Sequence, residues 1–289
     1  MLQFFHKNQG VVVSREAYLI KKLSSHYIGD DAAVVGNRLY SMDAFFENVH
    51  FKRAWMSLSQ IARKAMLINI SDAVAMNAKP LYALVTLSLA PDMEKQEIDE
   101  ILQALHETAG EFGCEIIGGD TISGERLDFS ITIISKSEFP LLRRGLKVGH
   151  LLAYTGVLGE SKRDLERLFK GEKIADNSRF IEPVLRQAFI AQARPCLSVG
   201  MDISDGLFCD TNKLLDYNGI GFEPLMEIAD EVGQSGEEYE MLIGFDPSCR
   251  ERIAQIAKEE GIALSVFAQV APNTQRYPCQ SHHFKTELD

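Results

Sequence analysis

Apolar and polar positions alternate with two different periods along the first half of the chain, which predicts both strands and helices there. The segment 81–90 is strongly apolar and ends at Pro91, as expected of a buried strand. The segment 57–78 carries a broad apolar face at helical spacing, and 94–113 has acidic residues in its first turn and Gly113 at its end, which is typical of an amphipathic helix. We expect strands at 38–46, 81–90 and 127–137, a strand followed by a glycine-rich turn within 114–124, and helices at 57–78 and 94–113.

This alternation of strands and helices, with some strands paired directly, predicts a mixed α/β domain. A proline, a basic turn and a new apolar strand follow near residue 138, and further helices are expected at 161–171 and 181–195. We therefore predict two domains, an N-terminal α/β domain over 1–138 and a C-terminal α/β domain over 139–289. No low-complexity linker or charge block separates them, so we expect the two domains to pack closely.

The composition is that of an ordinary globular protein: of 289 residues, 46% are hydrophobic and 25% are charged, and the formal net charge is −11. A negative surface argues against binding to the phosphate backbone of nucleic acid. Because no apolar stretch reaches the length of a membrane span and the N-terminus lacks the pattern of a secretion signal, we expect a cytoplasmic protein with no membrane partner. The five cysteines are scattered and form no CxxC pair, which predicts neither disulfides nor a zinc site.

Aspartates recur beside Gly, Ser or Thr at the edges of apolar segments. Asp30 and Asp31 are adjacent in YIGDDAAVV, where their charges repel and a strand would point them to opposite faces. Asp72 lies inside a helix that is apolar on nearly all sides, where an unpartnered charge is costly. One aspartate after glycine is commonly a turn residue or a helix cap. A set of this size is harder to explain in that way, because few fixed positive charges are present to neutralise the carboxylates. The set comprises Asp31, Asp43, Asp72, Asp120, Asp202 and Asp205.

Carboxylate oxygens suit Mg²⁺, whose coordination is usually completed by water and by substrate phosphates. Gly118 and Gly119 allow close backbone approach and offer N–H donors. Arg143 and Arg144 offer a bidentate clamp for phosphate oxygens, and His50 is a candidate phosphate contact, although a lone histidine is more often structural. The chain has neither a GxxxxGK[ST] loop nor a GxGxxG motif, and no His/Cys cluster indicates a transition metal. We therefore expect nucleotide and Mg²⁺ binding on an unusual scaffold.

An ordered set of motifs runs along the chain: IGDDAAV, SMD, NVHF, KAMLINISDAVAMNAKP, GGDTISG, RRGLKVG, TGVLG, MDISDGL and SGEEYEML. In this order and at these spacings, the set resembles thiamine-monophosphate kinase, a family of the aminoimidazole ribonucleotide synthetase-like superfamily of ATP-using enzymes. The last motif is similar to the family's GGEDYEL. One such motif alone is weak, whereas the ordered set is specific.

The resemblance implies a two-domain α/β fold in which the N-terminal domain completes a β-barrel with a second subunit, and hence a homodimer. The implied reaction is direct in-line transfer of the ATP γ-phosphate to thiamine phosphate, giving thiamine diphosphate and ADP, assisted by several Mg²⁺ ions. Because the acceptor phosphate is already ionised at neutral pH, this reaction needs charge neutralisation rather than a general base. The lack of a Ser/His/Asp or Cys/His arrangement agrees with that requirement.

Residue by residue, the resemblance implies a role for each matching position. The implied metal-binding positions are Asp31, Ser41, Met42, Asp43, Asp72, Asp120, Asp202 and Asp205. The implied ATP-binding positions are Gly119, Asp120, Arg143 and Ser204, and the implied substrate-binding positions are His50 and Glu237. Because Met42 replaces a Thr-type residue of the family, a metal contact there would use only its backbone carbonyl. Asp30 is expected to serve structure or an outer coordination shell.

Other positions also depart from the family pattern. Leu102 stands where the family can have a nucleotide-contacting tyrosine, and His150 replaces the aspartate of a Gly-Asp pair. Ser281 occupies the position of an aromatic residue that usually stacks on the substrate, and Phe284 and Tyr277 are the candidates to replace it.

Two alternatives stay open from the sequence. One is another ATP-using enzyme of the superfamily: selenophosphate synthetase, aminoimidazole ribonucleotide synthetase or the hydrogenase-maturation dehydratase. The first usually has a reactive Cys or selenocysteine near its N-terminus and the last usually ends in cysteine, whereas here the first cysteine is Cys114 and the sequence ends in Asp289. The other alternative is a non-catalytic protein that binds divalent cations in an acidic cleft, against which Arg143 and the glycine-rich turns count.

Overall fold

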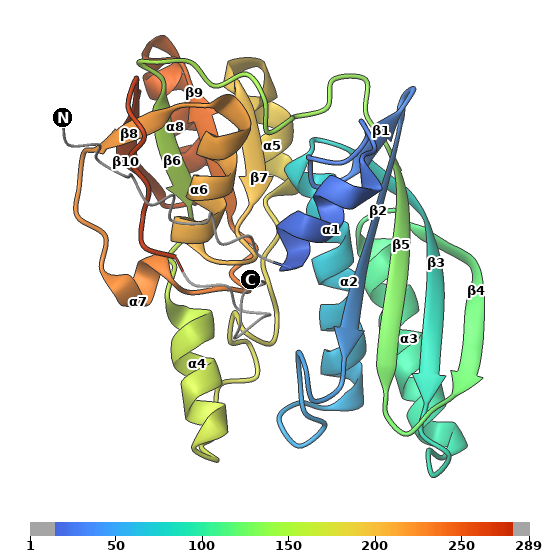
Figure 1. The fold of residues 1–289 in the computed structure, drawn as a ribbon. Coiled ribbons are helices and arrows are strands. Elements are labelled where there is room, and N and C mark those ends of the chain that lie inside the picture. The colour runs from blue at the N-terminus through green and yellow to red at the C-terminus, as the bar shows by residue number, and fades with distance from the viewer. Residues whose placement is uncertain (1–14, 280–289) are drawn as a thin grey trace, which may run out of the picture.

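The computed structural model describes residues 15–279 of the 289-residue chain and contains two five-stranded sheets with helices packed around them (Figure 1). In Figure 1 the first sheet stands at the right, the second at the left, and helix α2 (Leu58–Ala75) lies between them. The mixed α/β class predicted from the sequence is confirmed. No helix within residues 15–279 combines the length and the apolar character needed to cross a membrane.

The first sheet has the strand order β1-β2-β5-β3-β4. Strands β3 and β4 run parallel because helix α3 connects them, whereas the other neighbouring strands are antiparallel. Helices α2 and α3 pack against one face of this sheet (Figure 1). Its elements are α1 (Arg15–Leu23), β1 (Ala33–Val35), β2 (Arg38–Phe46), α2 (Leu58–Ala75), β3 (Lys79–Leu89), α3 (Lys95–Glu111), β4 (Glu115–Ser123) and β5 (Asp128–Lys136).

The second sheet is antiparallel throughout, in the order β7-β9-β6-β10-β8. Helix α6 packs on one face and helices α5 and α8 on the other, so that every residue of β6, β7 and β9 is buried. The segment that joins β5 to β6 contains the predicted domain boundary at residue 138. The elements are β6 (Leu151–Thr155), α4 (Glu160–Phe169), α5 (Gln187–Ala193), β7 (Val199–Asp202), α6 (Leu207–Asn218), β8 (Gly221–Pro224), α7 (Asp230–Gly233), β9 (Met241–Phe245), α8 (Arg250–Glu259) and β10 (Leu264–Ala271).

Helix α2 connects the two halves of the fold. It begins with a capping box, in which the Ser57 side chain accepts the Gln60 N–H and the Gln60 side chain accepts the Ser57 N–H. Most of its 18 residues are buried, because α2 contacts the first sheet on one side and β7 and α5 on the other. This position explains the apolar character of the helix on nearly all sides, and it places Asp72 in the interior between the sheets.

One helix predicted from the sequence is partly wrong. Residues 181–195 were expected to form a single helix, but α5 spans only Gln187–Ala193 and a 3₁₀ turn follows it. The residues before α5 take an irregular path along which Arg179 and Arg186 both donate to the buried carboxylate of Glu240. Apolar spacing gives no sign of such a buried ionic group, so the pattern overestimated the length of the helix.

The prediction that the chain has no disulfide is also wrong. Cys209 on α6 is bonded to Cys279, which lies after β10, whereas Cys114, Cys196 and Cys249 are free thiols. The bonded cysteines are 70 residues apart in the sequence, so their spacing did not reveal the pairing. The bond attaches the segment after β10 to the helix that begins beside Asp205.

Candidate metal and nucleotide site

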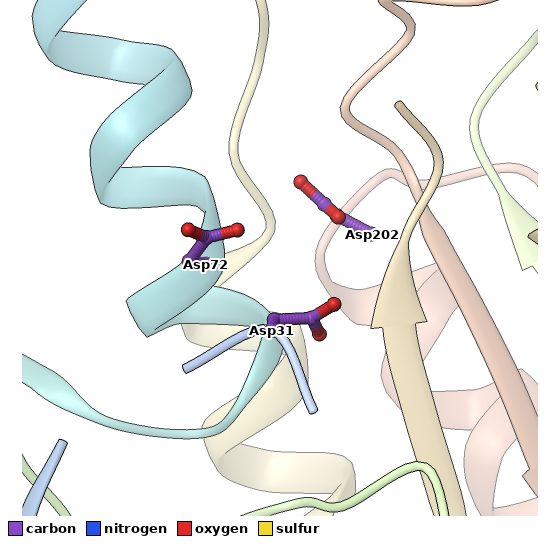
Figure 2. A group of neighbouring side chains, drawn as sticks. All are labelled: Asp31, Asp72 and Asp202. Atoms are coloured by element: carbon purple, nitrogen blue, oxygen red, sulfur yellow. The ribbon is translucent and has the colours of Figure 1, made fainter. Parts of the chain in front are cut away.

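Three aspartates from separate segments meet in a cavity between the two sheets, and Figure 2 shows their carboxylates directed toward a common space. Asp31 comes from the loop before β1, Asp72 from α2 and Asp202 from the end of β7. One ligand oxygen of each lies within 4.8 Å of the ligand oxygens of the other two. The cavity has a volume of about 620 Å³. Other predicted site residues that line it are Met42, Asp43, His50, Arg143, Ser204, Asp205 and Glu237.

The carboxylates of this group repel one another in a buried setting. Burial raises the pKa of Asp72 well above its usual value, and the charges of Asp43 and Asp202 raise it further. Burial and the charge of Asp31 raise the pKa of Asp202 to about 8, although the Ser71 hydroxyl donates to Asp202 Oδ2 over 2.6 Å. The protein side chains therefore supply too little positive charge to keep all of these carboxylates ionised at neutral pH.

Arg143 supplies part of that charge. Its guanidinium pairs with Asp31, with Nε 3.1 Å from Asp31 Oδ1, and its backbone N–H donates to Asp30 Oδ1 over 2.7 Å. The Asp30 side chain therefore links the loop that contains Asp31 to the segment that contains Arg143. The two adjacent aspartates have different roles, because Asp31 pairs with the guanidinium and Asp30 binds the backbone. Within residues 15–279, Asp31 Oδ2 is buried and accepts no hydrogen bond. A buried carboxylate oxygen without a donor fits a metal ligand.

A second acidic group lies at the start of α6. Asp205 forms an ion pair with Lys213, whose Nζ is also 3.2 Å from Asp210 Oδ1. Asp210 Oδ2 accepts the backbone N–H of Asp205 over 3.0 Å, and burial raises the pKa of Asp210 to about 6. Sequence analysis identified Asp205 but missed Asp210 and Lys213. Their separation of three residues, which places them on one side of a helix, was the only signal for them.

Asp43, on β2, and His50, in the turn that follows β2, both line the cavity. The Asp43 N–H donates to Asn69 Oδ1 over 2.8 Å, which fixes β2 against the helix that carries Asp72. His50 Nδ1 accepts the Phe46 N–H over 2.9 Å, so the proton of the neutral imidazole is on Nε2. His50 is therefore arranged to donate a hydrogen bond through Nε2.

Three predicted site residues, Ser41, Gly119 and Asp120, do not line this cavity. Ser41 is buried within the first sheet, on β2. Gly119 lies within strand β4, where the sequence predicted a glycine-rich turn. Its φ is +149°, and a Cβ there would lie 1.8 Å from the Val85 carbonyl oxygen. Close approach of β4 to β3 therefore requires glycine at position 119, whatever its part in nucleotide binding.

Asp120 lies on the opposite face of the first sheet from Asp43. The strand register aligns Asp43 with Ile131, Ile131 with Val85, and Val85 with Gly119, so position 119 shares a face with Asp43. Because successive side chains of a strand alternate between faces, the side chain of Asp120 points to the other face. The two aspartates are also three strands apart, which is about 14 Å at the usual strand spacing. One metal ion therefore cannot join Asp43 and Asp120 of the same chain.

Without divalent cations, the protein is expected to lose stability as the pH rises from 6 to about 8. The raised pKa values of Asp72 and Asp202 mean that the folded state holds protons which the unfolded state has already released, so rising pH favours unfolding. Calorimetric melting in chelator at several pH values measures this slope. Asp202→Asn should flatten it, and stability that increases over the same range would contradict the assignment.

Comparison with known proteins identifies relatives of this chain. The family described as AIR synthase related protein, N-terminal domain, matches residues 29–136. The thiamine-monophosphate kinase of Aquifex aeolicus is 30% identical over 235 residues, and that of Rhodopirellula baltica is 30% identical over 254 residues; each match covers 76% of this chain and 76% of the relative. A solved structure, AaThiL complexed with AMPPCP and TMP, has a TM-score of 0.80 at 21% identity and covers 96% of this chain and 99% of that one. At this identity, the structural match shows a shared fold.

Proposed function

Because the chain belongs to the thiamine-monophosphate kinase family and is a kinase, we propose that it transfers the γ-phosphate of ATP to thiamine phosphate by direct in-line displacement. The observation that carries this proposal is the group Asp31, Asp72 and Asp202 in the cavity between the sheets. The relative's complex with AMPPCP and TMP supports the same two substrates here. Family membership sets aside the non-catalytic alternative.

The donor set at this site fits Mg²⁺. All of the grouped side chains are carboxylates, their ligand oxygens lie within 4.8 Å of one another, and Asp31 Oδ2 has no donor within residues 15–279. Asp31, Asp72 and Asp202 would hold the ion, which when bound neutralises charge on the phosphates. We propose that several ions bind, with Asp43, Asp120, Asp205, Ser41 and the Met42 carbonyl as further ligands.

Other residues of the chain would bind and orient the substrates. Arg143 and Ser204 are proposed to contact ATP together with Gly119 and Asp120, and His50 and Glu237 to contact the acceptor. Support for the shared location comes from Arg143, Ser204, His50 and Glu237, which line one cavity. With its proton on Nε2, His50 can donate to a phosphate oxygen as a neutral side chain. No residue needs to remove a proton from the acceptor, since its phosphate is already ionised.

A second copy of the chain is proposed to cover the first sheet on the face that α2 and α3 leave open. Apolar side chains are exposed on these strands, among them Tyr40, Met42, Tyr82 and Leu84. The outer strand β4 is also largely exposed along its length. A partner sheet on that face would bury these side chains, complete the implied barrel, and bring Asp120 of one subunit toward the site of the other.

Light scattering at micromolar concentration should therefore show a homodimer, and a stable monomer would contradict the proposal. If Asp120 acts in the partner's site, coexpressed Asp72→Asn and Asp120→Asn chains should recover about a quarter of wild-type activity, because half of randomly paired dimers are mixed and each mixed dimer keeps one intact site of two. A mixture no more active than either variant alone would show that Asp120 acts with Asp72 of its own chain.

The reaction itself is tested by product analysis with thiamine phosphate and with free thiamine as acceptors. We expect thiamine diphosphate and ADP in equal amounts from thiamine phosphate and ATP, and no phosphorylation of thiamine, because free thiamine lacks the ionised phosphate that attacks the γ-phosphate in the proposed reaction. Selenide, as the acceptor of a related reaction, is the control for the superfamily alternative. Turnover of thiamine alone would overturn the assignment.

Two further points belong to the proposal. The division into domains 1–138 and 139–289 is supported by the two separate sheets. A cytoplasmic location is supported by ATP as co-substrate. Among the aromatic candidates for the acceptor, Tyr277 stacks on Phe208 at 4.2 Å instead of lining the cavity, and Ser281 and Phe284 lie outside the described residues.

A further inference from the structure

A fully buried lysine on α2 contacts the cavity through one glutamate. The Lys64 side chain is 0% exposed, and its Nζ lies 2.6 Å from Glu237 Oε2. Its ammonium also lies 3.8 Å from the ring centre of Phe180 and 5.6 Å from that of Phe45. Burial lowers the pKa of Lys64, and the Glu237 charge opposes that shift. Without its carboxylate partner, an ammonium in such surroundings is an uncompensated buried charge, which destabilises the folded protein strongly.

The backbone of Glu237 is held as firmly as its side chain. Its φ of +55° lies in the left-handed region, which is unfavourable for a glutamate. Its N–H donates to the Ser204 carbonyl oxygen over 2.7 Å, and its carbonyl oxygen accepts the Ser161 hydroxyl over 2.9 Å. Three contacts from separate segments therefore fix one residue in a strained conformation at the cavity wall, as is common for residues that contact ligands.

The ion pair leaves one carboxylate oxygen of Glu237 available to the cavity. Lys64 contacts Oε2, and within residues 15–279 no hydrogen bond is formed by Oε1. The same cavity holds Asp31, Asp43 and Asp72, and a cation bound by them would also attract the Glu237 carboxylate. The Lys64 ammonium opposes this attraction, because it occupies the oxygen that a second ligand contact would use.

We propose that Lys64 is a positioning residue, which holds the Glu237 carboxylate in place as a hydrogen-bond acceptor for an N–H donor on the ring portion of the phosphate acceptor. This inference rests on the proposed function, in which Glu237 contacts the acceptor. Lys64 acts through Glu237 and across the two halves of the molecule, because α2 packs on the first sheet and Glu237 lies in the loop before β9.

The test is steady-state kinetics of Lys64→Met, which keeps an apolar chain of similar length among the aromatic rings. The KM for thiamine phosphate should rise at least about tenfold, as for loss of a charge-assisted hydrogen bond, while kcat and the KM for ATP change by less than about threefold. Lys52→Met is the matched control, since Lys52 lies over Trp55 in the same aromatic group, 5.2 Å from the ring centre, and does not line the cavity. An unchanged KM for thiamine phosphate, or an equal loss in kcat, would overturn the inference.

A double variant tests whether Lys64 affects substrate binding through Glu237 or independently of it. Glu237→Gln leaves an unpaired buried ammonium, so this variant should melt at a lower temperature than Lys64→Met/Glu237→Gln, in which both charges are absent. The double variant should have the same KM for thiamine phosphate as Glu237→Gln. The inference would be overturned if the KM increases of the two single variants multiply in the double variant, or if their losses of stability add.

The melting comparison needs no substrate, so it distinguishes failure of this inference from failure of the proposed function. A wild-type enzyme that does not phosphorylate thiamine phosphate overturns the proposed function and the acceptor assigned to Glu237. Stability that fails to recover in the double variant overturns the role of Lys64 even when the wild-type enzyme is active.

Discussion

Asp72→Asn is expected to lower kcat by at least about a hundredfold, on the order of 3 kcal/mol of transition-state stabilisation, while the protein folds as before. The substitution keeps the shape of the side chain and removes one charge from the group that also contains Asp31 and Asp202. Without divalent cations the variant should be as stable as the wild type or slightly more stable, because repulsion that raises the pKa of Asp72 is removed. Initial rates and calorimetric melting measure the two effects.

Asp164→Asn is the matched control for this prediction. Asp164, on α4, is a buried aspartate that accepts a hydrogen bond from the Ser178 hydroxyl and does not line the cavity. This variant should lose stability and keep most of its turnover, the reverse of the result for Asp72→Asn. Near-normal turnover of Asp72→Asn with a large drop in melting temperature would show that Asp72 serves structure and that the metal site is misplaced.

Removal of Mg²⁺ is expected to have the other large effect, a loss of ATP affinity by about a hundredfold or more. The cavity walls carry several aspartates. Among the lining residues in the described range 15–279, only Arg143 and Lys213 bring a fixed positive charge, and each is already paired with a carboxylate. A nucleotide triphosphate entering such a cavity without cations meets net repulsion. Calorimetric titration with ATP in Mg²⁺ and in chelator measures the difference.

AMP is a useful control for that titration, because it carries less charge and its binding should depend less on Mg²⁺. Equal affinity for ATP in Mg²⁺ and in chelator would contradict the prediction, since the aspartates would then make no contribution through a cation.

Much of the site could be predicted from the sequence, because its aspartates sit at positions where an unpartnered charge is costly. Asp72 is the clearest case: an acid in a helix that is apolar on nearly all sides must meet a partner in the interior. Asp31 and Asp202 follow the same logic at the edges of apolar strands, and the three meet in one cavity. The order of the motifs then indicated the family.

The rest depended on contacts between distant segments, which no local pattern encodes. Lys64 looked like an ordinary helix residue, and only the packing of α2 against Phe180 and Glu237 shows it to be buried. The face of β4 on which Asp120 lies could not be predicted either. A register shift in the pairing of β4 with β3 places Asp120 on the face that points away from the cavity. The Cys209–Cys279 bond likewise depends on where the chain returns after β10.

The central claim is that Asp31, Asp72 and Asp202 form a divalent-cation site for phosphoryl transfer. Crystals grown with Mn²⁺ in place of Mg²⁺ and with a non-hydrolysable ATP analogue test it directly, because Mn²⁺ is located by its anomalous scattering. We predict a Mn²⁺ peak at coordination distance from carboxylate oxygens of these three aspartates and from a phosphate oxygen of the nucleotide. Nucleotide bound in the cavity with no Mn²⁺ at these aspartates, or with Mn²⁺ held only by other residues, would contradict the account.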